Sequence, residues 1–400
     1  MATIFYSQRS IFCSLATVLY PLSTILYLQH YFTDAMRIVI KVGTNVLRAG
    51  TERIHRPRLI DLARQIAHLI QEKHEPILVS SGAIFAGREL LGVDKPAQRK
   101  DIPHKQMLAA VGQGRLLALY QQIFEMYNLV VAQALLTRAD LAHRTRYLNA
   151  RNTLLLLLQR KVVPIINEND VVAVDEIKFG DNDKLSALVA NLVDADLLII
   201  LTDQLGLFTA DPRRDARAEL IQQVVAIDEK VRAIAGGSST SVGTGGMITK
   251  IEAAELATRS GTEVVIAPGN EHDSILRIVS GEALGTRFPT QMSQIESRKR
   301  WILAEAAQGS IKIDEGAATA LTQAGKSLLA VGVTEISGNF ERGATIRVLN
   351  GHDQEIARGI ANYSAANLRA ICGKQSHQIA DILGYEYGPT AIHRDNLVLV

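Results

Sequence analysis

Short apolar runs alternate with segments of helical periodicity between residues 36 and 287. The apolar runs are rich in Val, Ile and Leu, and several lack the polar alternation of a half-exposed strand, which is typical of strands buried on both faces. They predict strands at residues 37–42, 76–79, 129–133, 162–166, 197–201 and 263–267. Between them apolar residues recur at helical spacing, as at Leu59, Leu62 and Ile66. Strands that alternate with helices predict an α/β fold, a mostly parallel sheet sandwiched by helices.

The pattern changes near residue 290. Residues 292–301 are polar and charged, and from Gly309 onward short strands and tight turns replace the longer elements. Asn350-Gly351, between two apolar runs, is a strong hairpin signal. We therefore predict a first domain over residues 36–290, a linker over residues 291–307, and a small C-terminal mixed α/β domain over residues 308–388.

Residues 1–35 differ from the rest of the chain. The 24 residues between Arg9 and Asp34 carry no fixed charge, and a membrane span needs about 20 apolar residues. Three interpretations stay open: a dispensable or mis-assigned extension, a membrane anchor and a targeting peptide. We favour a dispensable hydrophobic extension, because a strand is predicted at Arg37 without any spacer.

Composition narrows the class of protein. The chain has 43 Lys and Arg against 41 Asp and Glu, so no global basic field draws it to nucleic acid. Its 47% hydrophobic and 21% charged residues are ordinary for a globular protein. Without the extension Cys372 is the only cysteine, which excludes an intrachain disulfide and fits a cytoplasmic location.

Polar residues follow the predicted strands, where open parallel sheets bind ligands. Lys41 and Gly43 end the first strand and could approach a phosphate, although a lysine at a strand end is common. Ser81 and Gly82 follow the second strand, where helix N–H groups can bind an anion or a serine can simply cap the helix. Each of these signals is weak alone.

Two further polar clusters follow the fourth strand. Asn167, Glu168, Asn169 and Asp170 form the first, and Asp181, Asn182 and Asp183 lie in the second. They could recognise a charged small molecule, or be solvated turns. Asp181 or Asp183 could also supply a carboxylate near Mg²⁺, which prefers oxygen ligands.

A glycine-rich run at residues 243–246 leads directly into an amphipathic helix that carries Lys250. Glycines let backbone N–H groups crowd a polyphosphate, and the lysine adds charge. We therefore predict phosphate binding here. The AGKS run at residues 324–327 resembles the end of a Walker A loop, but Ala320 stands where its first glycine is required and the run follows a helix.

Together these motifs identify a family. From Met36 to Glu386 the chain resembles the glutamate 5-kinases, amino-acid kinases with a C-terminal PUA domain. The matching runs lie, in order, at residues 40–44, 80–84, 136–140, 166–170, 180–183, 201–203, 243–250, 337–340 and 382–387. The resemblance implies an amino-acid kinase fold with a PUA domain, and ATP-dependent phosphorylation of the side-chain carboxylate of L-glutamate in proline biosynthesis.

The resemblance also assigns residues and partners. It implies that glutamate is held by Ser81, Asp170 and Asn182, and that ATP is held by Lys41, Thr202, Asp203, Thr244, Gly245, Gly246, Met247, Ile248, Thr249 and Lys250. Lys41, Lys250 and Asp183 would be catalytic, with ATP and Mg²⁺ as cofactors. Asp183 and Asp181 would orient the metal, the lysines or the glutamate ammonium. We further expect feedback inhibition by L-proline and a homo-oligomer, a dimer or a tetramer, with no nucleic-acid or membrane partner.

Three rivals are weighed against this assignment: another kinase of the same fold, an RNA-binding protein and a membrane-anchored sensor. PUA folds elsewhere bind RNA, but residues 309–386 hold seven Lys or Arg against eight Asp or Glu. A net charge of −1 gives no basic surface for a phosphate backbone. The sensor rests only on residues 1–35.

Overall fold

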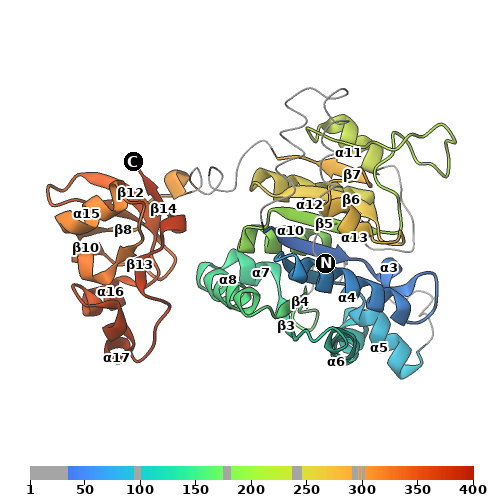
Figure 1. Ribbon diagram of the computed structural model, residues 1–400, viewed down its shortest axis with the longest axis horizontal. Helices are drawn as coiled ribbons and strands as arrows, with labels where there is room; N and C mark the ends of the chain where they lie inside the picture. Colours follow the sequence, from blue (N-terminus) through green and yellow to red (C-terminus); the bar gives the residue numbers. More distant parts are fainter. Residues whose placement is uncertain are drawn as a thin grey trace, which may run out of the picture.

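The computed structural model describes residues 35–93, 101–173, 182–236, 246–290 and 302–400, together with Glu296 and Lys299. The predicted extension, except Ala35, and most of the predicted linker lie outside these residues. The described chain forms a larger α/β domain and a smaller domain that contains the C-terminus (Figure 1). No helix within the described ranges is long and apolar enough to cross a membrane.

A seven-stranded sheet forms the centre of the larger domain, in the order β3-β4-β2-β1-β5-β6-β7. Neighbouring strands are parallel, except that β7 pairs antiparallel with β6. The mostly parallel sheet is therefore confirmed, and β7 is an edge strand that the sequence pattern did not predict. The strands are β1 Arg37–Val42, β2 Glu75–Ser80, β3 Val131–Leu136, β4 Val163–Glu168, β5 Leu197–Thr202, β6 Glu263–Pro268 and β7 Thr286–Phe288.

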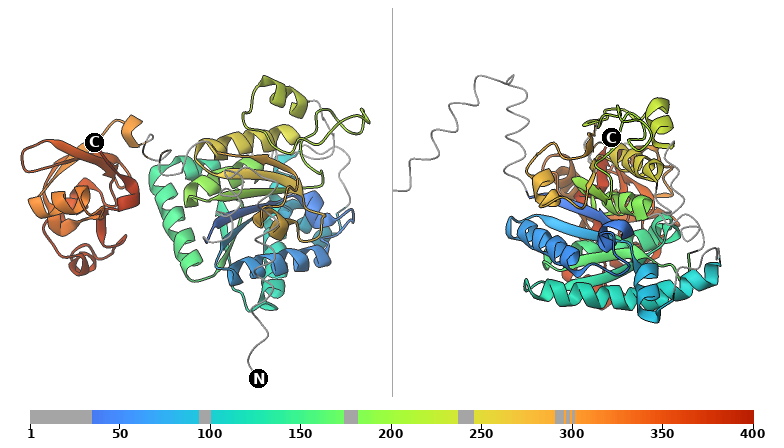
Figure 2. Two further views of the ribbon diagram at one scale, coloured as in Figure 1. Left: turned by 45° about the horizontal axis from the view of Figure 1, so that its top comes forward. Right: turned by 90° about the vertical axis from the view of Figure 1, so that its right-hand side faces the viewer.

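Helices cover both faces of this sheet (Figure 2). They are α3 Thr44–Arg48, α4 Arg56–Gln71, α5 Ala83–Leu91, α6 Ile102–Glu125, α7 Arg138–Ala142, α8 Arg144–Gln159, α10 Asn182–Val193, α11 Glu229–Gly236, α12 Met247–Arg259 and α13 Ser274–Val279. Alternate residues of β1 point to opposite faces. Ile38 and Ile40 pack with α4 and α6, whereas Val39 packs with α10 and α12. Burial on both faces explains the unbroken apolar runs.

The smaller domain has a five-stranded sheet in the order β10-β8-β11-β12-β14 and a two-stranded sheet of β13 and β9. Its elements are β8 Gly309–Ile313, α15 Glu315–Thr322, β9 Leu328–Leu329, β10 Val333–Gly338, β11 Thr345–Leu349, β12 Glu355–Ile360, α16 Ala365–Ile371, α17 Ile379–Leu383, β13 Thr390–Ile392 and β14 Leu397–Leu399, with short 3-10 turns at Ala330–Gly332, Ser376–Gln378 and Arg394–Asn396. The hairpin predicted at Asn350-Gly351 joins β11 to β12. Because β14 pairs with β12, this sheet extends beyond the predicted boundary at residue 388.

The two domains are in contact through α8. Arg342 of the smaller domain donates a hydrogen bond to Asn149, and Arg144 donates one to the carbonyl of Gly343. Leu148 packs with Ile302, Ile360 and Val398 in a small apolar cluster.

Candidate active site

The carboxyl ends of the central strands lie at one edge of the sheet. Val42 of β1 is in register with Ser80 of β2 and with Leu201 of β5. The residues that follow these strands are therefore neighbours, although they are far apart in the sequence. Lys41, Ser81 and Thr202 all belong to this edge.

A buried cluster of charges forms where β1, α10 and α12 meet. The Lys41 Nζ lies 2.5 Å from Asp183 Oδ1, and the Lys250 Nζ lies 3.0 Å from Asp183 Oδ2. The Thr249 hydroxyl donates to Asp183 Oδ2 over 2.9 Å. Asp183 is fully buried and both lysines are 6% exposed. Three residues predicted to be catalytic are thus in direct contact.

The two lysines control the ionisation of Asp183. Burial alone would raise the pKa of this carboxyl, but the positive charges of Lys41 and Lys250 and their hydrogen bonds more than offset burial and hold the pKa below its usual range. The carboxylate is therefore ionised at neutral pH. With both lysines protonated the charges of the three side chains sum to +1, and two ammonium groups suit a site for an anion.

At this edge α5 and α12 begin without a side-chain cap. Gly82, with a left-handed backbone at φ +102°, precedes α5, and Gly246 precedes α12; neither helix start has a side-chain hydrogen bond at its N-cap in the described chain. Capping of α5 by a serine, the alternative drawn from the sequence, is therefore wrong. Helix N-termini attract negative charge, and Lys250 lies in the first turn of α12.

Polar side chains gather beside the charge cluster. The Asn182 Nδ2 donates to Ser81 Oγ and to Asn167 Oδ1, each over 3.0 Å. Ser81 and Asn182 thus lie together as the resemblance implies. Asp170 lies in the turn after β4, close in the chain to Asn167.

Of the remaining predicted residues, some lie at the strand ends or in α12 and others lie outside the described residues. Thr202 is buried at the end of β5 and donates to Asp203 Oδ1 over 3.1 Å, and Asp203 also accepts from Asn45. Met247 and Ile248 form the first turn of α12. Asp181, Thr244 and Gly245 lie outside the described residues.

The described residues contain no cluster of metal-ligating side chains that could hold a metal ion by itself. No three His, Cys, Asp or Glu residues in the described ranges are grouped so that they could hold a metal ion. Asp183 does not fit the role of a direct magnesium ligand, because its two oxygens contact two lysine ammonium groups. Of the roles that the sequence left open for Asp183, its contacts match the orientation of the lysines.

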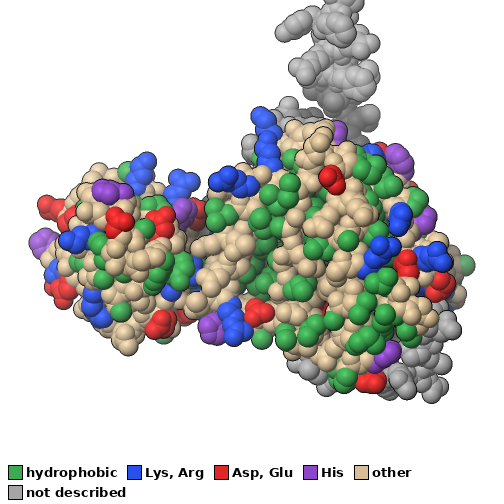
Figure 3. Space-filling model, turned by 90° about the horizontal axis from the view of Figure 1, so that it is seen from below, with side chains coloured by type: hydrophobic (Ala, Val, Ile, Leu, Met, Phe, Trp, Pro, Cys, Tyr) green, Lys and Arg blue, Asp and Glu red, His purple; other side chains and the backbone are tan. Residues whose placement is uncertain are grey.

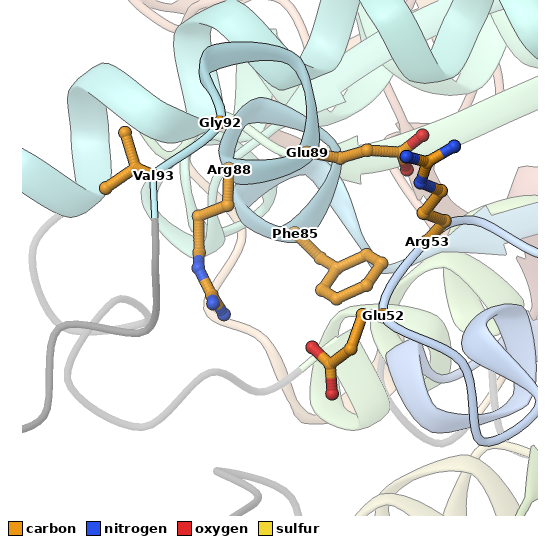
Figure 4. Close-up of a pocket in the computed structure, with 7 residues that line it drawn as sticks. All are labelled: Glu52, Arg53, Phe85, Arg88, Glu89, Gly92 and Val93. Atoms are coloured by element: carbon orange, nitrogen blue, oxygen red, sulfur yellow. The ribbon is translucent and has the colours of Figure 1, made fainter.

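A separate open pocket of about 530 Å³ lies beside α5 (Figure 4). It is lined by two arginines, two glutamates and three other residues, namely Arg53, Arg88, Glu52, Glu89, Phe85, Gly92 and Val93. None of the predicted site residues lines it, and its charges are balanced. We therefore place the candidate active site at the strand ends.

Sequence reasoning missed several residues that support the site. Asn167 was visible only as part of a polar run. Gln113 and Tyr120 lie on α6, where helical periodicity gives no sign that Gln113 contacts Asn167 or that the Tyr120 hydroxyl lies 2.8 Å from Ser80 Oγ. Asn45 gave no signal at all.

Comparisons with known proteins agree with this geometry. The profile of the Amino acid kinase family matches residues 36–268, and that of the PUA domain matches residues 309–383. The "Glutamate 5-kinase" of Herpetosiphon aurantiacus is 56% identical over 364 residues, covering 91% of this chain and 98% of that protein. The "Glutamate 5-kinase" of Deinococcus radiodurans is 55% identical over 365 residues, covering 91% of this chain and 100% of that protein. That of Aliivibrio fischeri is 53% identical over 369 residues, covering 92% and 100%.

The chain belongs to the amino acid kinase family and carries a C-terminal PUA domain. It is a kinase, and use of ATP follows from the family.

Proposed function

We propose that this protein transfers the γ-phosphoryl group of ATP to the side-chain carboxylate of L-glutamate. The product is L-glutamyl 5-phosphate, and the reaction is the first step of proline biosynthesis. The observation that carries the proposal is the buried Lys41–Asp183–Lys250 cluster beside Ser81 and Asn182. The relatives named Glutamate 5-kinase match along almost their whole length, which supports the same activity here.

The chemistry requires charge rather than a base. The acceptor is already a carboxylate at neutral pH, so no group must remove a proton from it. The difficulty is to bring this anion against a polyanion and to stabilise the charge on the transferring phosphoryl. Lys41 and Lys250 supply two positive charges in a buried site, where electrostatic interactions are stronger than in water.

Asp183 acts in this proposal by positioning the two lysines. It holds one ammonium on each carboxylate oxygen, so neither lysine has to be ordered when substrates bind. Ser81, Asp170 and Asn182 would hold glutamate. Thr202, Asp203 and the α12 N-terminal segment, residues 244–250, would hold the nucleotide. Mg²⁺ stays a predicted cofactor.

The direct test is ADP release by the purified full-length protein with and without L-glutamate. We expect release that depends on L-glutamate and is far slower with aspartate, N-acetylglutamate, carbamate or UMP. Equal or faster release with one of these acceptors would assign the protein to another branch of the family. Absence of release with all of them would contradict the proposal.

Inhibition by L-proline belongs to the same proposal. Proline carries an α-ammonium and an α-carboxylate as glutamate does, so it should compete at the glutamate site. Saturating glutamate should then abolish inhibition in initial-rate measurements. Inhibition that stays constant as glutamate rises would place proline elsewhere. The homo-oligomer and the cytoplasmic location stay predictions.

RNA binding by the smaller domain is not favoured. Its net charge is −1 over residues 309–386, and positive and negative side chains are interspersed on the face of this domain seen at the left of Figure 3. A protein that binds a phosphate backbone needs a basic surface.

A further inference from the structure

A chain of side-chain amides runs from α6 to the candidate glutamate site. The Gln113 Oε1 accepts from Asn167 Nδ2 over 3.3 Å, and Asn167 Oδ1 accepts from Asn182 Nδ2 over 3.0 Å. Gln113 and Asn167 are both buried, at 8% and 3% exposure. Asn182 is the last member, and it touches Ser81.

The peptide groups of Glu168 fix the direction of this chain. An amide side chain can present either its NH₂ or its C=O, and its hydrogen-bond partners decide which. The carbonyl of Glu168 can only accept, and it faces Gln113 Nε2 at 3.2 Å. The N–H of Glu168 can only donate, and it faces Asn167 Oδ1 at 2.9 Å. Both contacts fix the same orientation. Gln113 donates to the Glu168 carbonyl and accepts from Asn167, and Asn167 donates to Gln113 and accepts from Asn182.

The direction of the chain determines what the last amide offers to a ligand. The Asn182 NH₂ faces Asn167 and Ser81, and it also lies 3.3 Å from the carbonyl of Ser80. Its Oδ1 is consequently turned away from them. This oxygen is buried and has no hydrogen-bond partner among the described residues. A buried acceptor without a partner is unfavourable, so it favours a ligand that donates.

We infer that Gln113 is a positioning residue that makes the pocket selective for a protonated amine. This inference rests on the proposed function. Of the three charged groups of L-glutamate, two are carboxylates that only accept and one is an ammonium that donates. The Asn182 Oδ1 therefore receives the α-ammonium, and Gln113 acts on substrate choice from α6 without touching the substrate.

The first test compares acceptors in the full-length enzyme. Glutarate has both carboxylates of glutamate but no amine. We expect kcat/KM for glutarate to be at least about 100-fold lower than for L-glutamate, since a site built to hydrogen-bond a group strongly rejects an analogue that lacks it. Equal kcat/KM for the two acceptors would overturn the inference.

The second test changes Gln113 itself. Gln113→Met removes, at similar volume, the side-chain hydrogen bonds of Gln113 to Asn167, to the Glu168 carbonyl and to Gln133. We expect the KM for glutamate to rise about tenfold, with kcat and the KM for ATP changed less than about threefold. The preference for glutamate over glutarate should fall about tenfold, because the side chains of Asn167 and Asn182 would no longer be held in the orientation that accepts from the ammonium. Gln113→Glu can still accept from Asn167 but cannot donate to the Glu168 carbonyl, and should change the same constants in the same direction.

Gln65→Met is the matched control. Gln65 is also a buried glutamine, which joins α4 to α13 by accepting from the N–H of Ile275 and donates to Asp61 on its own helix, but it does not contact the amide chain. It should lower the melting temperature as Gln113→Met does and leave the glutamate KM and the acceptor preference unchanged. If the Gln113 variants keep the wild-type values, or if Gln65→Met shifts them equally, Gln113 has no such role. Failure of the proposed function is distinguishable, because the wild-type protein would then release no ADP in response to glutamate.

Discussion

Asp183 is a carboxylate with no exposed surface, held between the ammonium groups of Lys41 and Lys250. A single buried charge is very unfavourable, whereas a buried cluster of opposite charges with good geometry is tolerated. When all three groups are ionised, the charges of these three side chains sum to +1. A phosphoryl group in transfer carries negative charge, which these two ammonium groups would stabilise.

Lys250 should act mainly on the rate of transfer. We expect Lys250→Ala to lower kcat by about 10²–10³-fold, the usual effect of losing one preorganised electrostatic group, with little change in the glutamate KM. Lys250→Arg should restore activity only in part, because a guanidinium differs in shape from an ammonium. Steady-state kinetics on the purified variants measures this.

Lys184→Ala is the matched control for Lys250→Ala. Lys184 also joins α10 to α12, through Glu252 at 2.6 Å, but this pair is partly exposed. Its kcat should stay within about threefold of wild type, since exposed ion pairs contribute little. A Lys250→Ala variant with intact kcat and a raised glutamate KM would show that the assigned role is wrong.

Asp183 should also govern the pH dependence of stability. Its native pKa is held below the value in the unfolded chain, so its contribution to the free energy of unfolding is fully present above pH of about 4 and is lost as the pH falls through the native pKa. We expect Asp183→Asn to be less stable by about 3–5 kcal/mol at pH 7, because two buried ammonium groups lose their counter-charge.

Urea unfolding at a series of pH values measures this difference. The gap between wild type and Asp183→Asn should stay constant from pH 7 to about 5 and narrow below about 4. A gap that widens in acid would mean that the native pKa of Asp183 lies above the unfolded value.

At the scale of elements, burial on both faces made the existence of most strands predictable from the sequence. The residues at which the strands begin and end were less predictable. The third strand was expected at residues 129–133 but is Val131–Leu136, because pairing with β4 carries it on to Leu136, in register with Glu168. The three residues of β7 are too few for a pattern. In the site, motif order predicted Lys41, Lys250 and Asp183, but only the meeting of β1, α10 and α12 reveals that each carboxylate oxygen of Asp183 contacts a lysine ammonium.

The crossing of α5 and α6 depends on two glycines. A Cβ on Gly87 would lie 1.9 Å from the Leu108 carbonyl oxygen, and a Cβ on Gly112 would lie 1.8 Å from that of Ala83. Either alanine substitution must push the helices apart, at a cost of about 1–3 kcal/mol or more. Because α5 starts directly after Ser81 and Gly82, we also expect the glutamate KM to rise.

Gly114→Ala is the control on the same helix. A Cβ there meets nothing within 4 Å, so the better helix propensity of alanine should leave stability unchanged or raise it by up to about 1 kcal/mol. Thermal unfolding and the glutamate KM are measured for all three alanine variants. Gly87→Ala and Gly112→Ala proteins as stable as Gly114→Ala would contradict the close approach.

At the scale of the whole molecule, the smaller domain is held to α8 by a few specific contacts. The Arg342 guanidinium lies 3.7 Å from the centre of the Tyr387 ring and also reaches Asn149. This cation–π contact positions the arginine side chain within its own domain. A cavity of about 320 Å³ remains beside these contacts, between α8 and residues Ile360 and Asn396. Because only a few contacts join the smaller domain to α8, we expect the two domains to separate without either one unfolding.

Gly343 lies at the point where the smaller domain approaches α8. Its backbone is left-handed at φ +93°, and a Cβ would lie 2.5 Å from Arg144 Cγ and 2.9 Å from Leu148 Cδ1. Gly384, in the same domain, has a similar φ of +77° but open space around it. Alanine at either position strains the backbone by a similar amount, about 1 kcal/mol, so comparing the two variants isolates the effect of the contact with α8.

We expect Gly343→Ala to raise the radius of gyration measured by small-angle scattering while Gly384→Ala leaves it unchanged. Glutamate-dependent ADP release should stay within about threefold in both, because the proposed active-site residues belong to the larger domain. Equal scattering from the two variants would show that α8 does not hold the smaller domain in place.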